Sequence, residues 1–265
     1  IAMTGDGVND ASAIKKADIG ISMGKIGTDV AKEASDLILL DDSFSTIIDA
    51  IEEGRTVFRN VRQTSLYLIT TNLAEDLMIL FSVFIGTPLP LLPLQILWLN
   101  LVTDGLSDIA LATEPPHSDV LNHKPVRKNE KIVRMVDLKK TIFLSGIMAI
   151  VSLLAYKYFL YYDLDKARTM AFTIMVFCQL FNVINMRSIE EPVINIGYFS
   201  NKNINISIII SIVLFSIVMF VPRLSEIFGF YQPSLYELLI ALLLSSLVLI
   251  SGELYKWKRG KINGF

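Results

Sequence analysis

The chain has 265 residues, of which 52% are hydrophobic and 19% charged, and its formal net charge is −2. Its mean hydropathy of +0.52 exceeds that of an ordinary soluble domain, so we expect much of it to lie in a lipid bilayer. This charge balance provides no basic surface for nucleic acid, and the single cysteine excludes an intrachain disulfide.

The first 40 residues alternate short apolar runs with stretches typical of helices. The apolar runs are residues 1–3, 19–22 and 37–40, and the helical stretches are 10–17 and 28–34. This βαβα rhythm predicts part of a parallel sheet. We therefore assign residues 1–42 to a soluble α/β segment that precedes the membrane-embedded part.

The sequence TGDGVND follows the first predicted strand. Gly5 and Gly7 permit a tight turn, and Asp6 and Asp10 stand four residues apart where the next helix starts. Mg²⁺ is held by one or two carboxylates together with waters and phosphate oxygens, so the two aspartates favour a magnesium–phosphate site. For an isolated GDG, a turn in which Asp10 merely caps the helix is the simpler interpretation.

A helix capped by Asp42 or Ser43 is predicted to form a cytoplasmic stalk over residues 43–65 and to continue into the membrane. Apolar segments long enough to cross about 30 Å of hydrocarbon follow. These six predicted spans are residues 66–85, 94–113, 138–158, 167–186, 204–221 and 236–254. They predict a six-helix transmembrane domain over residues 66–255, followed by a basic tail, 256–265.

The loops predict the orientation of the chain in the membrane. The connection 114–136 and the tail are basic, whereas the opposite loops are short and carry few charges. The basic residues of that connection are Lys124, Arg127, Lys128, Lys131 and Arg134. By the positive-inside rule both basic segments face the cytoplasm, and an even number of spans places the N-terminal segment there too.

Polar side chains lie inside the first two predicted spans. Asn72 and Glu75 are three residues apart in one, and Asn100, Thr103 and Asp104 stand at i, i+3 and i+4 in the other. A short loop makes these spans antiparallel neighbours, so the two polar stripes can face each other. Amide, hydroxyl and carboxylate oxygens suit Ca²⁺, and two carboxylates balance one divalent cation.

These polar groups can instead hydrogen-bond between helices and stabilise the bundle. Glu75 and Asp104 favour a cation site, because a charged side chain at mid-membrane costs about 2.5–3.5 kcal/mol on insertion scales. Asp76 and Asp108 can line the same cavity or a path that leads to it. A third stripe, for which a structural role is equally supported, consists of Gln179, Asn182 and Asn185.

The stretch TGDGVNDASAIKKADIGISMG resembles the hinge motif of P-type ATPases, whose phosphorylation domain has a haloacid-dehalogenase-like, Rossmann-like fold. Ser12 replaces a proline of the usual TGDGVNDAPAL. The resemblance implies that Asp6 binds the catalytic Mg²⁺, that Asp10 supports the phosphorylation site, and that residues 1–42 end the phosphorylation domain. Residues expected to contact the cofactors, ATP and Mg²⁺, are Gly5, Gly7 and Asn9.

LITTNLAED and LLPLQILWLNLVTDGL look like the fifth and sixth membrane helices of calcium pumps. This resemblance implies that the transported cation is bound by Asn72, Glu75, Asn100, Thr103 and Asp104. Sodium and potassium pumps carry aspartate at the position of Asn100, which favours Ca²⁺. Gln179 stands where a glutamate would complete a further calcium site, so we expect it to be a weak ligand. LSDIAL in place of the family's LPATAL leaves Na⁺ or H⁺ open.

The resemblance covers effectively the whole chain and implies the C-terminal part of an ATP-driven cation pump that works through an aspartyl-phosphate. The sequence contains no DKTG, TGE-bearing actuator, nucleotide-binding domain or PEGLP helix. The expected partner is therefore a missing N-terminal half with actuator, nucleotide-binding domain and first four membrane helices. Alone, as a split product, partial sequence or pseudogene product, the chain is expected to be inactive.

Three functions remain open at this stage. The first is a Ca²⁺ pump, and the second is a Na⁺ or H⁺ pump of the same family. The third is a non-enzymatic membrane subunit or regulator built on the same scaffold.

Overall fold

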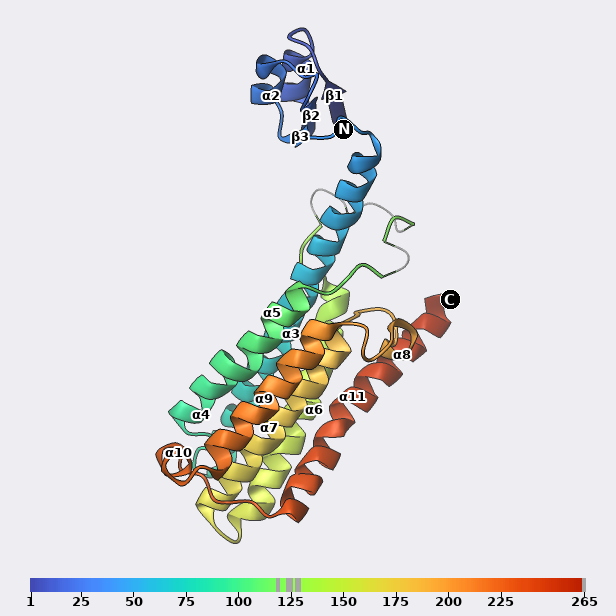
Figure 1. Ribbon diagram of the computed structural model, residues 1–265. Coiled ribbons are helices and arrows are strands. Elements are labelled where there is room, and N and C mark those ends of the chain that lie inside the picture. Colours follow the sequence, from blue (N-terminus) through green and yellow to red (C-terminus); the bar gives the residue numbers. More distant parts are fainter. Residues whose placement is uncertain (118–119, 123–125, 127–129, 264–265) are drawn as a thin grey trace. The chain divides into compact units, whose positions relative to one another are not determined.

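A computed structural model describes residues 1–117, 120–122, 126 and 130–263 (Figure 1). The chain divides into two compact units. One contains Ile1–Thr56 with the described residues 120–122, and the other contains Val57–His117 with residues 126 and 130–263. The predicted basic residues Lys124, Arg127 and Lys128 lie outside the described residues.

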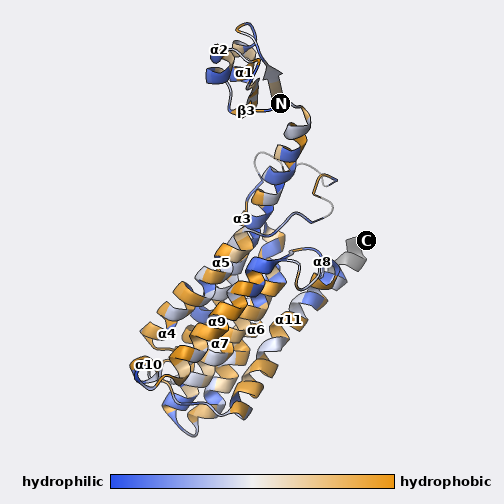
Figure 2. Cartoon of the chain, viewed as in Figure 1, coloured by the Kyte–Doolittle hydropathy of each residue, from blue (hydrophilic) through white to orange (hydrophobic). Residues whose placement is uncertain are grey.

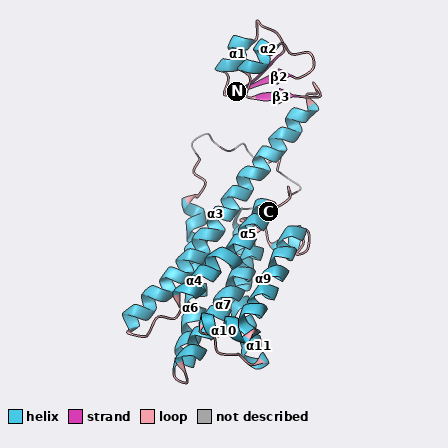
Figure 3. Cartoon of the chain, turned by 60° about the vertical axis from the view of Figure 1, so that its left-hand side comes forward, coloured by secondary structure: helices cyan, strands magenta, loops and turns pink. Residues whose placement is uncertain are grey.

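The first unit is a small parallel sheet with two helices. Strands β1 (Ala2–Gly5), β2 (Ile19–Met23) and β3 (Leu37–Leu39) pair in the order β1-β2-β3. Helix α1 (Ala11–Lys16) joins β1 to β2, and α2 (Asp29–Ala34) joins β2 to β3 (Figure 3). The βαβα order and the parallel pairing predicted for this region are confirmed.

The two faces of β2 serve different neighbours. Gly20 lies against Ile14 of α1, where a Cβ atom would overlap the isoleucine. Ile21 and Met23 point to the opposite face, because side chains alternate along a strand, and form a small core with Leu39. This core is too small to cover the apolar side chains of the unit.

The second unit is a bundle of helices. Its long members are α3 (Ser45–Ile85), which begins in the first unit, α6 (Met135–Leu160), α7 (Leu164–Met186), α9 (Lys202–Phe220) and α11 (Leu235–Asn263). Each contains a window long and apolar enough to cross a membrane. The predicted continuity of the stalk with the first span is confirmed, because α3 is one helix.

Helix α7 forms the centre of the bundle. Within its most apolar window 83% of the residues are buried, compared with 28–44% for the other long helices. The outer faces of α9 and α11 are hydrophobic (Figure 2), as expected for surfaces that contact acyl chains. Side-chain caps include Asp163, which accepts from an amide at the start of α7, and Asn201, which does so at α9.

The second predicted span, residues 94–113, is not a single α-helix. It consists of α4 (Pro93–Trp98), the π-helix η1 (Leu99–Asp104) and α5 (Gly105–Ala112). Five helices rather than six therefore qualify as spans by length and composition among the described residues. A π-turn inserts extra backbone into a helix and commonly occurs at functional sites.

Three further differences from the predicted elements concern the connections between spans, the C-terminal helix and the boundary between the units. Two short helices, α8 (Val193–Ile196) and α10 (Pro222–Phe228), lie in connections between the predicted spans. Helix α11 continues through most of the predicted tail to Asn263, and residues 264–265 lie outside the described part. The boundary between the two units, after Thr56, falls inside the predicted stalk and within the single helix α3.

Candidate functional site

The turn between β1 and α1 carries both aspartates of TGDGVND. Asp10 stands at the start of α1, yet its side chain makes no capping hydrogen bond to that helix. Its Oδ2 instead accepts from the backbone N–H of Asp6 (3.3 Å) and of Gly7 (3.1 Å). The interpretation of Asp10 as a simple helix cap is therefore wrong. Its carboxylate closes the turn on which Asp6 lies.

Close packing explains the glycine at the entry to this turn. Gly5 has a negative φ, but a Cβ atom on it would overlap the side chain of Asp10. Gly7 is less restricted, because a Cβ there would meet Asp10 Oδ2 at an ordinary 3.5 Å. Of the two glycines predicted to shape the turn, only Gly5 leaves no room for a Cβ atom beside Asp10.

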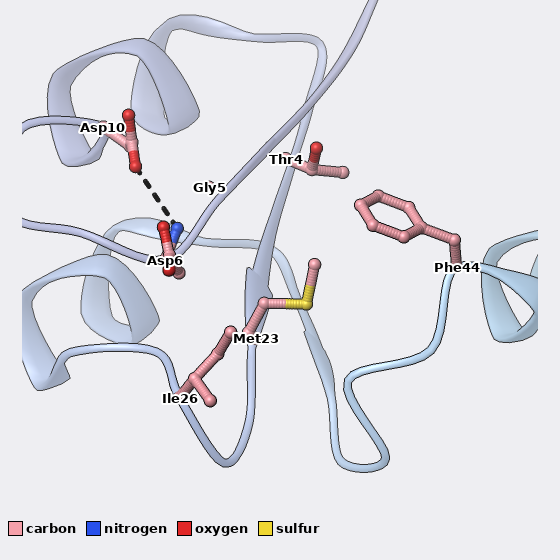
Figure 4. A pocket seen from close by; sticks show the side chains of 7 residues that line it. All are labelled: Thr4, Gly5, Asp6, Asp10, Met23, Ile26 and Phe44. Carbon is pink, nitrogen blue, oxygen red and sulfur yellow. Dashed lines mark hydrogen bonds between the residues drawn. The ribbon is translucent and has the colours of Figure 1, made fainter.

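A cleft of about 320 Å³ opens beside the turn (Figure 4). Its lining residues are Thr4, Gly5, Asp6, Asp10, Met23, Ile26 and Phe44. Gly7 and Asn9, which were expected to contact the cofactor, are not among them. Two carboxylates beside an open cleft fit Mg²⁺ held with phosphate oxygens and waters. Among the described residues, no group of three or more His, Cys, Asp or Glu side chains forms a metal site.

Asp42 fixes one border of this cleft. Its Oδ1 accepts from the N–H of Gly24 (2.6 Å) and Lys25 (2.9 Å), and its Oδ2 accepts from the N–H of Ile26 (3.0 Å). These donors, Lys25 foremost, hold the pKa of the Asp42 carboxyl below its usual value. Asp42 was one of two predicted caps for α3, but the carboxylate binds the loop instead, and Ser43 Oγ accepts from the Ser45 amide.

The bundle contains a second group of predicted site residues, centred on Asp104 at the end of η1. The side chain is 1% exposed. Its Oδ1 accepts from the hydroxyl of Tyr67 (2.9 Å), and its Oδ2 accepts from Thr71 Oγ1 (2.7 Å), both on α3. Two hydroxyl donors on a neighbouring helix therefore orient this carboxylate inside the bundle.

Glu75 continues the same face of α3 one turn beyond Thr71 and is 3% exposed. Its Oε1 accepts from Nε2 of Gln179 on α7 (2.8 Å), and Thr71, one turn before it, donates to Asp104. The structure thus brings together three predicted ligands from three helices. Thr103, another predicted ligand, precedes Asp104 in the sequence and is also buried, with 1% of its surface exposed.

Asn72 and Asn100 do not join this buried group. Both are exposed, and each donates from Nδ2 to a carbonyl four residues earlier in its own helix, on Leu68 and Ile96 respectively. The expectation that Asn100 shares a face with Thr103 and Asp104 is wrong for this structure. It assumed α-helical spacing, whereas the π-helix places more residues in each turn and changes which residues align.

The stripe on α7 divides between two roles. Asn185 donates to the carbonyl of Val248 on α11 (2.9 Å) and packs against Gly252, which is a structural contact. Asn182 is fully buried, and neither of its amide atoms has a hydrogen-bond partner among the described residues, nor does Gln179 Oε1. Buried polar atoms of this kind are normally satisfied by water or an ion.

Three buried contacts were not predicted from the sequence: those of Tyr67 and Thr71 with Asp104, and that of Glu114 with Arg187. Tyr67 and Thr71 precede Glu75 at intervals of four, and this spacing would have placed all three on one helix face. The buried contact between Glu114 and Arg187 carried no comparable signal, because 73 residues separate the partners. Asp76 is exposed and Asp108 is half-buried, so neither lies fully inside the bundle.

A family model described as "Cation transporting ATPase, C-terminus" matches residues 88–258. The chain is similar to the calcium-transporting ATPase of Bacillus subtilis, with 45% identity over 231 residues that cover 86% of this chain and 26% of that protein. It is also similar to calcium-transporting ATPase 1 of Bacillus cereus, with 35% identity over 275 residues that cover 97% of the chain and 31% of the relative.

Similarity extends to eukaryotic proteins. Calcium-transporting ATPase 1 of Saccharomyces cerevisiae is 37% identical over 265 residues, which cover 98% of this chain and 28% of that protein. In these three comparisons the chain therefore spans about 26–31% of the relatives' length.

Proposed function

Because this chain belongs to the P-type cation-transporting ATPases and resembles the C-terminal part of their calcium pumps, we propose that it is the ion-binding part of an ATP-driven Ca²⁺ pump. The observation that carries the proposal is the buried pair of carboxylates, Glu75 and Asp104. Acids inside a membrane bundle are costly and generally belong to ion or proton pathways.

The buried cluster provides oxygen ligands of the type that Ca²⁺ prefers. In the proposed mechanism Glu75 and Asp104 supply the charge that balances one divalent cation, and Thr103 and Gln179 supply neutral oxygens. The hydroxyls of Tyr67 and Thr71 orient Asp104. Asn72 and Asn100 complete the ligand set from the exposed side, where the unmatched part of the pump would cover them.

The α/β unit is proposed to be the end of a phosphorylation domain with a haloacid-dehalogenase-like fold. Parallel strands followed by helices, with an acidic turn at the carboxyl end of β1, support this assignment. Bound Mg²⁺ would offset the charge of a phosphoryl group there. Asp6 would hold the metal, and Asp10 would keep the turn closed. This part alone is proposed not to hydrolyse ATP, because its sequence lacks DKTG.

We further propose the domain limits and partners expected from the sequence. Residues 1–42, 43–65, 66–255 and 256–265 would be the end of the phosphorylation domain, the stalk, the ion-binding bundle and the basic tail. The partners are the lipid bilayer and the actuator, nucleotide-binding domain and first four membrane helices of the pump. The α/β unit, the 114–136 loop and the C-terminus would face the cytoplasm.

Uptake of ⁴⁵Ca²⁺ by vesicles that contain the complete pump tests this function. Glu75→Gln and Asp104→Asn remove one charge each with little change in shape, so each variant should lose ATP-dependent uptake. Glu226→Gln provides a matched control, because Glu226 is exposed on α10. Wild-type vesicles without calcium uptake, or full uptake by both site variants, would reject the proposal.

One observation favours transport of Na⁺ or H⁺ as the second candidate. Asp108 adds a half-buried carboxylate near Asp104, and its Oδ1 has no hydrogen-bond partner among the described residues. An additional acid of this kind suits monovalent or proton transport. ATP hydrolysis that depends on Na⁺ or on a pH gradient, with no response to Ca²⁺, would support this candidate.

A further inference from the structure

A buried ion pair outside the cation cluster joins helix ends. Glu114 follows α5 and Arg187 caps the end of α7, and both side chains are fully buried. Oε1 of Glu114 lies 3.1 Å from Nε and 2.9 Å from Nη2 of Arg187. Removing both charges from water is unfavourable unless further hydrogen bonds satisfy them.

Such hydrogen bonds are present for the whole guanidinium group of Arg187. Besides Glu114, its acceptors are the carbonyl oxygens of Gly197 (2.8 Å) and Tyr198 (3.0 Å) and Oγ of Ser200 (2.5 Å). All five N–H donors of the side chain therefore have an acceptor. Oε2 of Glu114 also accepts from Nδ2 of Asn201 (2.7 Å), the residue whose Oδ1 caps α9.

Two side chains of helix α3 bind the main-chain carbonyl groups of the same two residues. Nε2 of Gln63 donates to the carbonyl of Arg187 (2.8 Å), and Nδ2 of Asn60 donates to the carbonyl of Glu114 (2.8 Å). Glu114 and Arg187 thus bind each other through their side chains and bind α3 through their main chains. We call these four residues the clasp.

The clasp connects the three segments that carry the buried cation cluster. Arg187 lies eight residues beyond Gln179, which is about 12 Å at 1.5 Å per helical residue. Glu114 lies ten residues beyond Asp104, and Gln63 lies on the same helix as Glu75. Because a helix resists compression along its axis, a shift at the clasp moves the corresponding ligand.

We propose that Glu114 and Arg187 are positioning residues, which fix the axial register of α3, α5 and α7 and thereby set the affinity of the buried cluster for Ca²⁺. The inference rests on the proposed function and deepens it. It gives the ion pair a task that differs from simple stabilisation, because all three segments that carry the buried cluster are joined by it, together with the start of α9.

The first test compares the clasp with another ion pair, of which one partner is fully buried. Lys256 and Glu253 form an ion pair (2.6 Å) on α11, a helix without proposed ligands, and the Lys256 side chain is fully buried. In the complete pump, Arg187→Met and Glu114→Gln should raise the Ca²⁺ concentration for half-maximal uptake by about tenfold or more, since small misplacements of ligands have large effects. Arg187→Lys should give an intermediate value.

The control Lys256→Met removes a buried charge near Arg187 from a helix without proposed ligands. It should lower thermal stability as Arg187→Met does, yet change the half-maximal Ca²⁺ concentration by less than about twofold, because it leaves the hydrogen bonds of the clasp in place. An equal change for both substitutions would assign the clasp a purely structural role and overturn the proposal. An unchanged Ca²⁺ response in folded Glu114→Gln pump would overturn it as well, even if Arg187→Met does not fold.

A second measurement does not depend on calcium transport. Val61 on α3 and Ile109 on α5 are exposed and accept spin labels through Val61→Cys and Ile109→Cys in a Cys178→Ala chain in bilayer discs. The label distance should shift or broaden in Arg187→Met and Glu114→Gln but not in Lys256→Met. Wild-type pump without Ca²⁺ uptake would reject the proposed function, whereas unchanged distances would reject the clasp.

Discussion

Both units of this chain expose large apolar side chains, but among the described residues only the bundle also buries charged ones. In the α/β unit, large apolar side chains remain exposed, including Leu40 at 81% and Ile26 at 66%. In the bundle, charged side chains such as Arg187 and Lys256 are fully buried, while Ile109 on the surface is 70% exposed. Each unit therefore leaves on its surface a kind of side chain that a soluble globular protein would bury.

This difference shows that the two surfaces have different neighbours. Lipid is as apolar as leucine, so burying Ile109 inside the bundle would gain little, whereas polar groups inside the bundle can hold helices together. Under the proposed function the α/β unit lies outside the bilayer, so its exposed apolar side chains need another explanation. The proposed missing part of the pump would cover them, and this agrees with a chain that spans about 26–31% of three relatives.

The largest expected effect concerns the buried charges of the bundle. Arg187→Met leaves Glu114 charged and without its main partner, so the free energy of unfolding should fall by about 3–5 kcal/mol. The double variant Glu114→Leu and Arg187→Met should recover much of this loss. Unfolding by steric trapping in bilayer discs measures both, and additive losses would show that the pair is not coupled.

The close approach of α7 to α11 should have the next largest effect. A Cβ atom on Gly252 would overlap the side chain of Asn185, so Gly252→Val should cost about 1–3 kcal/mol by overpacking. Gly146→Val is the matched control, because a Cβ there meets nothing within 4 Å. The same unfolding assay applies, and equal stability of the two variants would contradict the packing.

In the α/β unit, neighbouring leucines should respond differently to charge. Leu39 is 2% exposed and belongs to the small core, so Leu39→Lys should unfold the unit or weaken it by about 2 kcal/mol or more. Leu40 is 81% exposed, so Leu40→Lys should change stability by less than about 0.5 kcal/mol. Limited proteolysis of the unit distinguishes these outcomes, and similar cleavage of both would be contrary evidence.

The smallest effect should be a pH dependence of the loop after β2. The N–H groups of Lys25, Ile26 and Gly24 lower the pKa of Asp42, so their contribution to stability is complete above the unfolded value of about 3.9. It should be lost as the pH falls through the lower folded pKa. Amide NMR shifts of these three residues should follow that titration.

Asp42→Asn is the matched variant for this titration, because asparagine tolerates the positive φ of 57° at this position and carries no charge. The amide shifts should then be independent of pH over the same range. A wild-type midpoint at or above about 3.9 would contradict the hydrogen bonds to the carboxylate.

Local patterns predicted most elements correctly because their causes are local. Apolar periodicity and length located α3, α6, α7, α9 and α11, and the alternation of short runs located the sheet. The spacing of the acids also predicted that Glu75 and Asp104 stand on neighbouring helices, and both are buried in the bundle, where Asp104 contacts Thr71 of α3. The π-helix escaped prediction, since residue spacing within an apolar segment does not distinguish π-helical from α-helical turns.

The sequence by itself determined which long helices are apolar enough to span a bilayer, where the acidic turn stands and which helices carry carboxylates, because hydropathy and residue spacing act over one or two helical turns. Only the tertiary structure decided that Asn72 and Asn100 stay exposed, that Asp42 binds a loop, and that Glu114 meets Arg187. These outcomes depend on packing between distant segments and on backbone geometry, neither of which local patterns encode.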